Sequence, residues 1–317
     1  MLIGKQVFIS GGAGFIGTSL AAKLAEHNQI ILYDNLHRNA LGNTALLNHP
    51  NVHFHEGDIL DLESLARAMV GATHVVHLAA IAGVDTVVAS PVRTMRVNLL
   101  GTVNALDAAH RLPGLERFVD FSTSEVFGTH AYKVEETHIT SQGSVGEARW
   151  TYAVSKLAGE YLSHSYYHEF HLPAATVRPF NIYGPNQVGV GAIHHFIRRA
   201  LSNQDVEIHG DGSQIRAWCY ISDIIDALLL ILEKPAAVGE VFNIGNPRST
   251  VTIFDLAKHI IRLSGSASKI VFRPINYVDV EIRVPSVEKA RALLNFDPQV
   301  DLEEGLQSTI QWYRARV

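Results

Sequence analysis

Short apolar runs rich in β-branched residues alternate with longer amphipathic segments through the first half of the chain. The runs predict strands over residues 6–10, 29–33, 52–56, 74–78, 117–122 and 174–178. The segments between them predict helices over residues 15–26, 62–69, 91–112 and 151–170. Strands and helices that alternate in this way form a parallel sheet with helices on both faces. The pattern therefore predicts an α/β fold with a doubly wound parallel sheet, whose ligand lies at the carboxyl ends of the strands.

The pattern loosens after Arg178, where proline and glycine become frequent. An amphipathic helix is expected next, over residues 192–202. We therefore expect a nucleotide-binding Rossmann domain over residues 1–180 and a smaller, discontinuous substrate-binding lobe made mainly of residues 181–317. A further strand near residues 241–245 is placed to return to the main sheet.

A glycine-rich turn follows the first predicted strand directly. Gly11, Gly14 and Gly17 have the G-x-x-G-x-x-G spacing, and the next predicted helix opens at Phe15-Ile16. The first glycine permits a tight turn, the second lets the backbone approach a pyrophosphate, and the third lets the helix pack on the sheet. The strand before the turn and the helix after it make a dinucleotide cofactor the expected ligand of Gly11, Gly14, Phe15, Ile16 and Gly17.

An acidic residue ends the second predicted strand, in the pair Asp34-Asn35. A carboxylate there accepts hydrogen bonds from the adenosine ribose and repels a 2′-phosphate. NAD is therefore favoured over NADP, although Arg38 close by weakens that preference. Further cofactor contacts are expected after the third and fourth strands and in the following helix, at Asp58, Ile59, Leu78, Ala79, Ala80 and Asn98. Asp58 equally suits a turn or a helix N-cap, and Asn98 a purely structural role.

A tyrosine and a lysine are spaced to share one face of a helix. Tyr152 and Lys156 stand at i and i+4. An ammonium group near a phenol favours the phenolate, and a positively charged nicotinamide lowers the phenol pKa further, so Tyr152 is expected to act as a base. The same spacing is common on exposed helices. Here, however, Ser122-Thr123-Ser124-Glu125 ends the fifth strand, at the sheet edge where doubly wound folds place their chemistry.

Together with the glycine turn, these residues resemble the extended short-chain dehydrogenase/reductase family that acts on nucleoside diphosphate sugars. The resemblance extends over essentially the whole chain, through residues 178–185, 210–216 and 242–245. It implies that Tyr152 and Lys156 are a catalytic pair that also contacts the cofactor, and that Thr123 polarises the sugar 4-oxygen. It also implies that Asn181 and Arg216 contact the substrate pyrophosphate.

Oxidation of a sugar at C4 opens three reactions: 4-epimerisation, 4,6-dehydration and loss of a C6 carboxylate. Simple 4-epimerases of this family usually lack a glutamate at the position of Glu125, whereas dehydratases that act on guanosine-diphosphate-mannose are similar in carrying Thr-Ser-Glu. On position alone, Glu125 also suits an N-cap or a solvated turn.

Several segments resemble UDP-glucuronate decarboxylases in particular: Thr123-Ser124-Glu125, Arg149-Trp150 and residues 277–286. The resemblance places Ser124 and Glu125 in the catalytic set and implies a catalytic role for Arg283, although elsewhere in the family an arginine at this place grips phosphate. A UDP-sugar substrate and decarboxylase-like chemistry are therefore favoured, with epimerisation or dehydration as the alternatives.

Composition and charge exclude several other classes. The 317 residues have a formal net charge of −5, and no cluster of Lys and Arg suits nucleic acid. Apolar runs such as residues 224–232 are too short to span a bilayer, and the N-terminal residues lack a signal-peptide pattern. Together with the lone Cys219, this predicts a cytoplasmic protein with no membrane partner. The 17 histidines are scattered, so no metal site is expected.

Two further expectations concern activity and assembly. A sensor that binds NAD(P) without catalysis typically loses the Tyr/Lys pair, so the presence of Tyr152, Lys156 and Thr123 favours an enzyme. Members of the resembled family usually form homodimers through the two long helices, here over residues 91–112 and 151–170. We therefore expect a homodimer.

Overall fold

A seven-stranded parallel sheet forms the centre of the structure, a computed structural model that describes residues 2–189, 191–275 and 277–316. The outermost limits of the two expected parts, residues 1 and 317, lie outside the described residues. The strand order is β12-β7-β5-β4-β1-β2-β3. The strands are β1 (Gln6–Ser10), β2 (Gln29–Asp34), β3 (Val52–Glu56), β4 (His74–His77), β5 (Arg117–Phe121), β7 (Ala174–Pro179) and β12 (Val241–Ile244).

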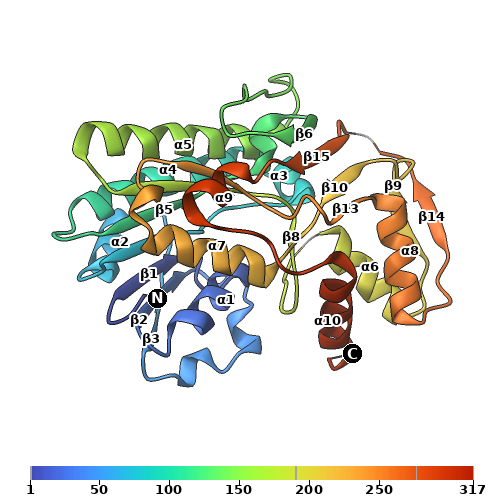
Figure 1. The fold of residues 1–317 in the computed structure, drawn as a ribbon, viewed down its shortest axis with the longest axis horizontal. Coiled ribbons are helices and arrows are strands. Elements are labelled where there is room, and N and C mark those ends of the chain that lie inside the picture. The colour runs from blue at the N-terminus through green and yellow to red at the C-terminus, as the bar shows by residue number, and fades with distance from the viewer. Residues whose placement is uncertain (1, 190, 276, 317) are drawn as a thin grey trace.

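Helices cover both faces of this sheet (Figure 1). They are α1 (Phe15–Leu24) and α7 (Ile221–Glu233) on one face, and α2 (Leu62–Met69), α4 (Pro91–His110) and α5 (Trp150–Phe170) on the other. Successive strand residues alternate between two cores: Val7 and Ile9 pack with α1 and α7, and Phe8 packs with α2 and α4. Because both faces are covered, the strands read as continuous apolar runs in the sequence. The predicted doubly wound α/β fold is confirmed.

The elements after β7 gather mostly at one end of the molecule (Figure 1). A four-stranded sheet in the order β13-β10-β15-β6 lies there. The remaining strands and α-helices of the described chain are β6 (His130–Val134), β8 (Ile182–Tyr183), β9 (Val206–His209), β10 (Ile215–Ala217), β11 (Cys219–Tyr220), β13 (Thr250–Thr252), β14 (Ile270–Arg273), β15 (Ile282–Pro285), α3 (Val84–Ala89), α6 (Ala192–Leu201), α8 (Ile253–Ser264), α9 (Glu288–Leu294) and α10 (Leu302–Arg314).

The chain crosses between the two parts in both directions. β12 pairs with β7 in the main sheet, and β6 pairs with β15 in the smaller sheet. The division at residue 180 stays a prediction.

Several predicted helices end about one or two residues later in the sequence than the helices of the structure, as is usual for helix termini. Across the described ranges, none of the helices is both long and apolar enough to cross a bilayer.

Candidate active site

A cavity of about 750 Å³ lies beside the glycine turn, at the carboxyl ends of β1, β2 and β4. Most of the predicted cofactor contacts line it, namely Gly11, Gly14, Asp34, Asn35, Asp58, Ile59, Leu78, Ala79 and Ala80. The others do not line it: Phe15, Ile16, Gly17, Asn98, Tyr152 and Lys156. Phe15 and Ile16 instead pack against the core shared by α1 and α7. A parallel sheet brings its strand ends to one edge, so residues far apart in sequence meet here.

Gly11 brings two strand ends into direct backbone contact. Its φ is +70°, and a Cβ atom built on it would lie 2.7 Å from the amide nitrogen of Ala79 and 2.8 Å from the carbonyl carbon of Leu78. A Cβ on Gly17 would lie 2.7 Å from the Gly11 oxygen, so this glycine lets α1 pack closely on the turn. This tight cradle, open toward the cavity at Gly11 and Gly14, fits the pyrophosphate of a dinucleotide.

Asp34 is held in place by the same turn. Its Oδ2 accepts a hydrogen bond from Ala13 N at 3.1 Å, and its Oδ1 accepts one from Leu36 N at 2.7 Å. Partial burial raises the pKa of Asp34, and these backbone hydrogen bonds oppose that rise. Each carboxylate oxygen accepts more than one hydrogen bond, so acceptor capacity for ribose hydroxyls remains.

Arg38 lies between two loops beside the cofactor cavity, which it also lines. Its Nη2 donates to the carbonyl oxygen of Ala82 at 2.6 Å, and its guanidinium lies against the backbone of Gly189. The guanidinium therefore connects the loop after β4 with the loop after β8.

The structure gives the contacts of two residues whose roles the sequence left open. Asn98 is fully buried, accepts from Ile81 N at 2.8 Å and donates to the Ile81 carbonyl and the Ser155 hydroxyl, both at 3.1 Å. It therefore holds the loop at Ile81, which lines the cavity. Asp58 accepts from Leu60 N at 2.9 Å, so its side chain closes a turn while also lining the cavity.

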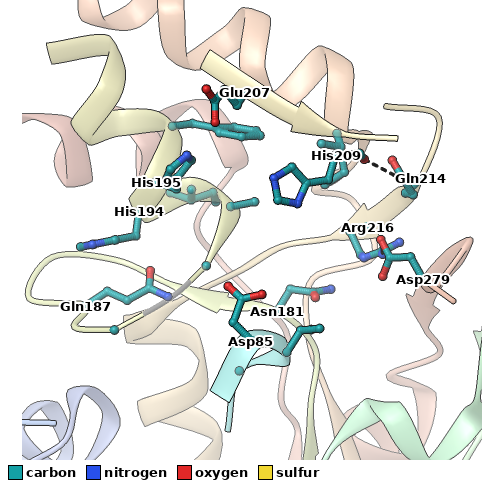
Figure 2. Close-up of a pocket in the computed structure, with 18 of the residues that line it drawn as sticks. Asp85, Asn181, Gln187, His194, His195, Glu207, His209, Gln214, Arg216 and Asp279 are labelled. Carbon is teal, nitrogen blue, oxygen red and sulfur yellow. Dashed lines mark hydrogen bonds and ion pairs between the residues drawn. The ribbon is translucent and has the colours of Figure 1, made fainter. Parts of the chain in front are cut away.

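A second cavity, of about 930 Å³, is lined by residues of both parts (Figure 2). Asp85, Asn181 and Gln187 lie on one side of it, and His195, Glu207 and His209 lie across from them. The three predicted substrate contacts, Asn181, Arg216 and Arg283, all line it, as does Glu125. Asn181, at a φ of +43°, donates from its amide to the Ala217 carbonyl at 2.8 Å.

Buried guanidinium groups gather on one wall of this cavity. Arg283 Nη1 lies 3.4 Å from Glu125 Oε1, and Arg149 Nη2 lies 3.8 Å from the same oxygen. Asp279 lies 3.3 Å from Arg149 and 3.5 Å from Arg216. Burial lowers the pKa of Arg216 to about 10 and also lowers that of Arg283. Three cations face two carboxylates on this wall of the second cavity, which we call the basic cavity. The wall therefore favours an anionic ligand.

Arg149 and Asp279 were not among the predicted site residues. Arg149 is only 5% exposed, its guanidinium lies over the rings of Trp150 and Tyr277, and its Nε and Nη1 have no hydrogen-bond partner among the described residues. The sequence signals were its position three residues before Tyr152 and the resemblance of residues 277–286 to decarboxylases.

Thr123, Glu125 and Tyr152 meet at the end of β5. Thr123 Oγ1 accepts from Glu125 N at 3.1 Å, which caps the 3-10 helix η3 (Ser124–Phe127), and it hydrogen-bonds to the Tyr152 phenol. Glu125 therefore faces the basic cavity rather than solvent. Ser124 is buried within η3 and does not line either cavity.

Lys156 is not among the groups that act most on the pKa of Tyr152 in this structure. Burial raises the pKa of Tyr152, and the charge of Glu125 raises it further. The Thr123 hydrogen bond and the cations Arg283 and Arg38 oppose that rise. Lys156 is instead buried with its Nζ 3.9 Å from Asp120 Oδ1.

A glycine cradle on one cavity and a Thr–Tyr pair beside Glu125, which lines a second, basic cavity, are the arrangement of a dinucleotide-dependent enzyme with an anionic substrate. The chain belongs to the NAD dependent epimerase/dehydratase family, whose model matches residues 7–245. The predicted family, and with it NAD as the cofactor, are confirmed.

Relatives of known activity cover almost the whole chain. A UDP-N-acetyl-alpha-D-glucosaminuronate decarboxylase of Bacillus cytotoxicus is 35% identical over 98% of this chain and 98% of its own. UDP-glucuronic acid decarboxylase 4 of Arabidopsis thaliana is 31% identical over 98% of this chain and 69% of its own. The UDP-glucuronic acid 4-epimerase of Bacillus cereus, solved with UDP-glucuronic acid and NAD, superposes with a TM-score of 0.89 at 29% identity, over 98% of this chain and all of that one.

The glycine cradle is tested by Gly11→Ala, with Gly4→Ala as the matched control. Gly4 has a φ of +69°, but no atom lies within 4 Å of the Cβ that it would gain. Both variants strain the backbone by about 1–3 kcal/mol, and only G11A also meets the Ala79 backbone. We expect NAD to bind G11A at least about 10-fold more weakly, or about 1.4 kcal/mol, by isothermal titration calorimetry. Equal NAD affinity in the two variants would contradict the cradle.

Proposed function

We propose that this enzyme decarboxylates a UDP-hexuronate, either UDP-glucuronate or its 2-acetamido counterpart, after transient oxidation at C4. The observation that carries the proposal is the position of Glu125. It lies within 3.4 Å of Arg283 and 3.8 Å of Arg149, and its charge acts on Tyr152. A substrate oriented with O4 at Tyr152 therefore has its C6 carboxylate near two guanidinium groups and a competing carboxylate.

The chain's own residues supply the proton transfers and the binding. Tyr152 accepts the proton of the C4 hydroxyl as a phenolate, which the positive charge of bound NAD would favour, and Thr123 orients that hydroxyl. NAD, when bound, would supply the acceptance of the C4 hydride and its return. Arg216 and Asn181 bind the diphosphate, for which the planar fork of a guanidinium is well suited.

The proposed reaction balances without an external oxidant. Loss of a hydride from C4 and a proton from O4 leaves a ketone, and the C5–C6 bond then breaks with its electron pair delocalised into that ketone. C6 leaves as carbon dioxide and C5 takes a proton from water. The hydride returns to C4 and the Tyr152 proton returns to O4. Repulsion between Glu125 and the substrate carboxylate is relieved when carbon dioxide leaves. This relief lowers the barrier to decarboxylation rather than strengthening the binding of the substrate.

The reaction is identified by its product. The enzyme would be incubated with NAD and UDP-glucuronate, UDP-N-acetylglucosaminuronate, UDP-galacturonate, UDP-glucose, dTDP-glucose or GDP-mannose, and the products read by mass spectrometry. We expect loss of the mass of carbon dioxide from a uronate, and no product with Tyr152→Phe. Loss of water would indicate a dehydratase, and an unchanged mass with altered retention an epimerase. No product from any of these sugars would leave the non-catalytic alternative.

Glu125→Gln separates the two stages of the reaction. We expect overall turnover to fall about 100-fold, on the scale of losing one electrostatic contribution to the transition state. Because Glu125 raises the pKa of Tyr152, its removal lowers that pKa, so the alkaline rise of the hydride-transfer rate moves to lower pH. Stopped-flow absorbance of the reduced cofactor gives this profile. Glu135→Gln, which removes a carboxylate exposed on the surface, is the control. An unchanged profile in E125Q would contradict the assignment.

A homodimer is proposed through α4 and α5, which pack side by side on one face of the main sheet. Their outer surface exposes apolar side chains, including Val92, Leu100, Val154 and Tyr161. We expect light scattering to give twice the chain mass of 34.8 kDa, and Leu100→Glu with Tyr161→Glu to give a monomer. Phe272→Glu, which places the same charge on an exposed apolar residue of β14, controls for general effects. A monomeric wild type would refute this.

A cytoplasmic location is also proposed. Cys219 is the single cysteine of the chain, and it is buried beside β8. Burial raises the pKa of its thiol, so it is inert toward oxidation. A sugar-nucleotide enzyme without disulfides suits a reducing compartment.

A further inference from the structure

Asp120, a buried carboxylate beside the helix that carries Tyr152 and Lys156, has no role in the mechanism above. Asp120 on β5 is 0% exposed. It points to the same face of the sheet as Phe118, toward α4 and α5. In the sheet register it stands opposite His77 on β4 and Thr176 on β7.

Neither oxygen of Asp120 has a hydrogen-bond partner among the described residues. Its nearest opposite charge is the Lys156 ammonium, 3.9 Å from Oδ1. The ammonium group is itself buried, since Lys156 is only 2% exposed. A buried carboxylate and a buried ammonium each cost several kcal/mol when left alone, so each of these groups depends on the other.

The remaining charged groups around Asp120 are already paired. Glu160, one helical turn beyond Lys156, receives hydrogen bonds from Arg178 Nε at 2.9 and 3.1 Å and from Arg178 Nη2 at 2.7 Å, and a further one from the Ser122 hydroxyl. This forms a closed, neutral unit between α5 and β7. It leaves Asp120 as the compensating charge for Lys156.

The other polar neighbours of Asp120 carry no charge. His77 Nδ1 is hydrogen-bonded to Ser10 Oγ at 2.7 Å, and its Nε2 is bonded to Thr102 Oγ1 at 3.1 Å. Burial and, to a smaller extent, the charge of Lys156 lower the pKa of His77 to about 3, so the ring is neutral at working pH. Thr102 on α4 and Thr176 on β7 complete the surroundings.

We propose that Asp120 is a positioning residue that acts through Lys156: its negative charge holds the buried ammonium in place, one helical turn from Tyr152. Protonation of Asp120 would release that hold. The inference rests on the catalytic role that the family resemblance implies for Lys156. Asp120 is 0% exposed and lines neither cavity.

The charge of Asp120 changes in an accessible pH range. Burial raises its pKa to about 6, with Lys156 lowering it and Glu160 raising it. Above about pH 6 the carboxylate is ionised and paired with Lys156. Below that pH it becomes neutral, and the native protein then resembles one with asparagine at this place.

The activity test compares wild type with Asp120→Asn. With UDP-glucuronate and NAD, we expect hydride transfer at pH 8 to be at least about 10-fold slower in D120N, because a small displacement of a catalytic group has effects of this size. The ratio of the two rates should fall toward one at pH 5, and KM should change little. In a Lys156→Met background, D120N should have little further effect.

Asp223→Asn is the matched control. Asp223 on α7 is also buried with a raised pKa, but its oxygens accept from Gln299 N and Val300 N on the opposite face of the sheet. D223N should leave the pH profile unchanged. A rate ratio between wild type and D120N that is constant from pH 5 to pH 8 would show a merely structural role and overturn the inference.

A second measurement needs no substrate, and D120S replaces D120N in it if D120N does not fold. Carbon-13 NMR of aspartate-labelled protein follows the Asp120 carboxyl, assigned by its absence from D120N or D120S. We expect it to titrate near pH 6 in wild type and at higher pH in Lys156→Met, since the ammonium lowers this pKa. An unchanged midpoint in K156M would overturn the coupling. Absence of any UDP-glucuronate reaction in wild type, with this NMR coupling intact, would count against the proposed function alone.

Discussion

The ion pair between Glu160 and Arg178 fixes helix α5 to the central sheet. Arg178 on β7 donates to both oxygens of the carboxylate, and the Ser122 hydroxyl at the end of β5 donates as well. Tyr152 and Lys156 precede Glu160 on the same helical face, so their positions over the strand ends follow from this anchor. Loss of one partner of a buried pair costs about 3–5 kcal/mol, a large share of a domain's stability. The geometry of the catalytic helix therefore depends on a contact that touches no substrate.

The basic cavity is built from charges that have not been fully neutralised. Arg149, Arg216 and Arg283 are all buried, and the carboxylates that face them, Glu125 and Asp279, lie 3.3–3.8 Å away. Such pairs are loose compared with the 2.7 Å bond between Arg178 and Glu160. The guanidinium groups of this cavity wall are thus less closely paired with carboxylates than Arg178 is, which leaves them able to attract an anion.

Much of the architecture and part of the site could be predicted from the sequence. The strands of the main sheet, the glycine turn and Asp34 are local features, because each depends on residues adjacent in the chain. Parallel-sheet geometry then carries the strand ends to one edge. Local reasoning could not show the contact of Arg38, whose guanidinium reaches a loop more than 40 residues away, where it donates to the Ala82 carbonyl.

The sequence by itself determined the fold class, the cofactor cleft and the Tyr152–Lys156 spacing, because these follow from hydrophobic periodicity and short-range geometry. Only the tertiary structure decided the electrostatics. It placed Glu125, not Lys156, among the charges that act most on Tyr152, and it gave Lys156 a partner in Asp120. Burial and charge proximity depend on which side chains meet across strands and helices, and that meeting is a property of the folded chain rather than of any segment in it.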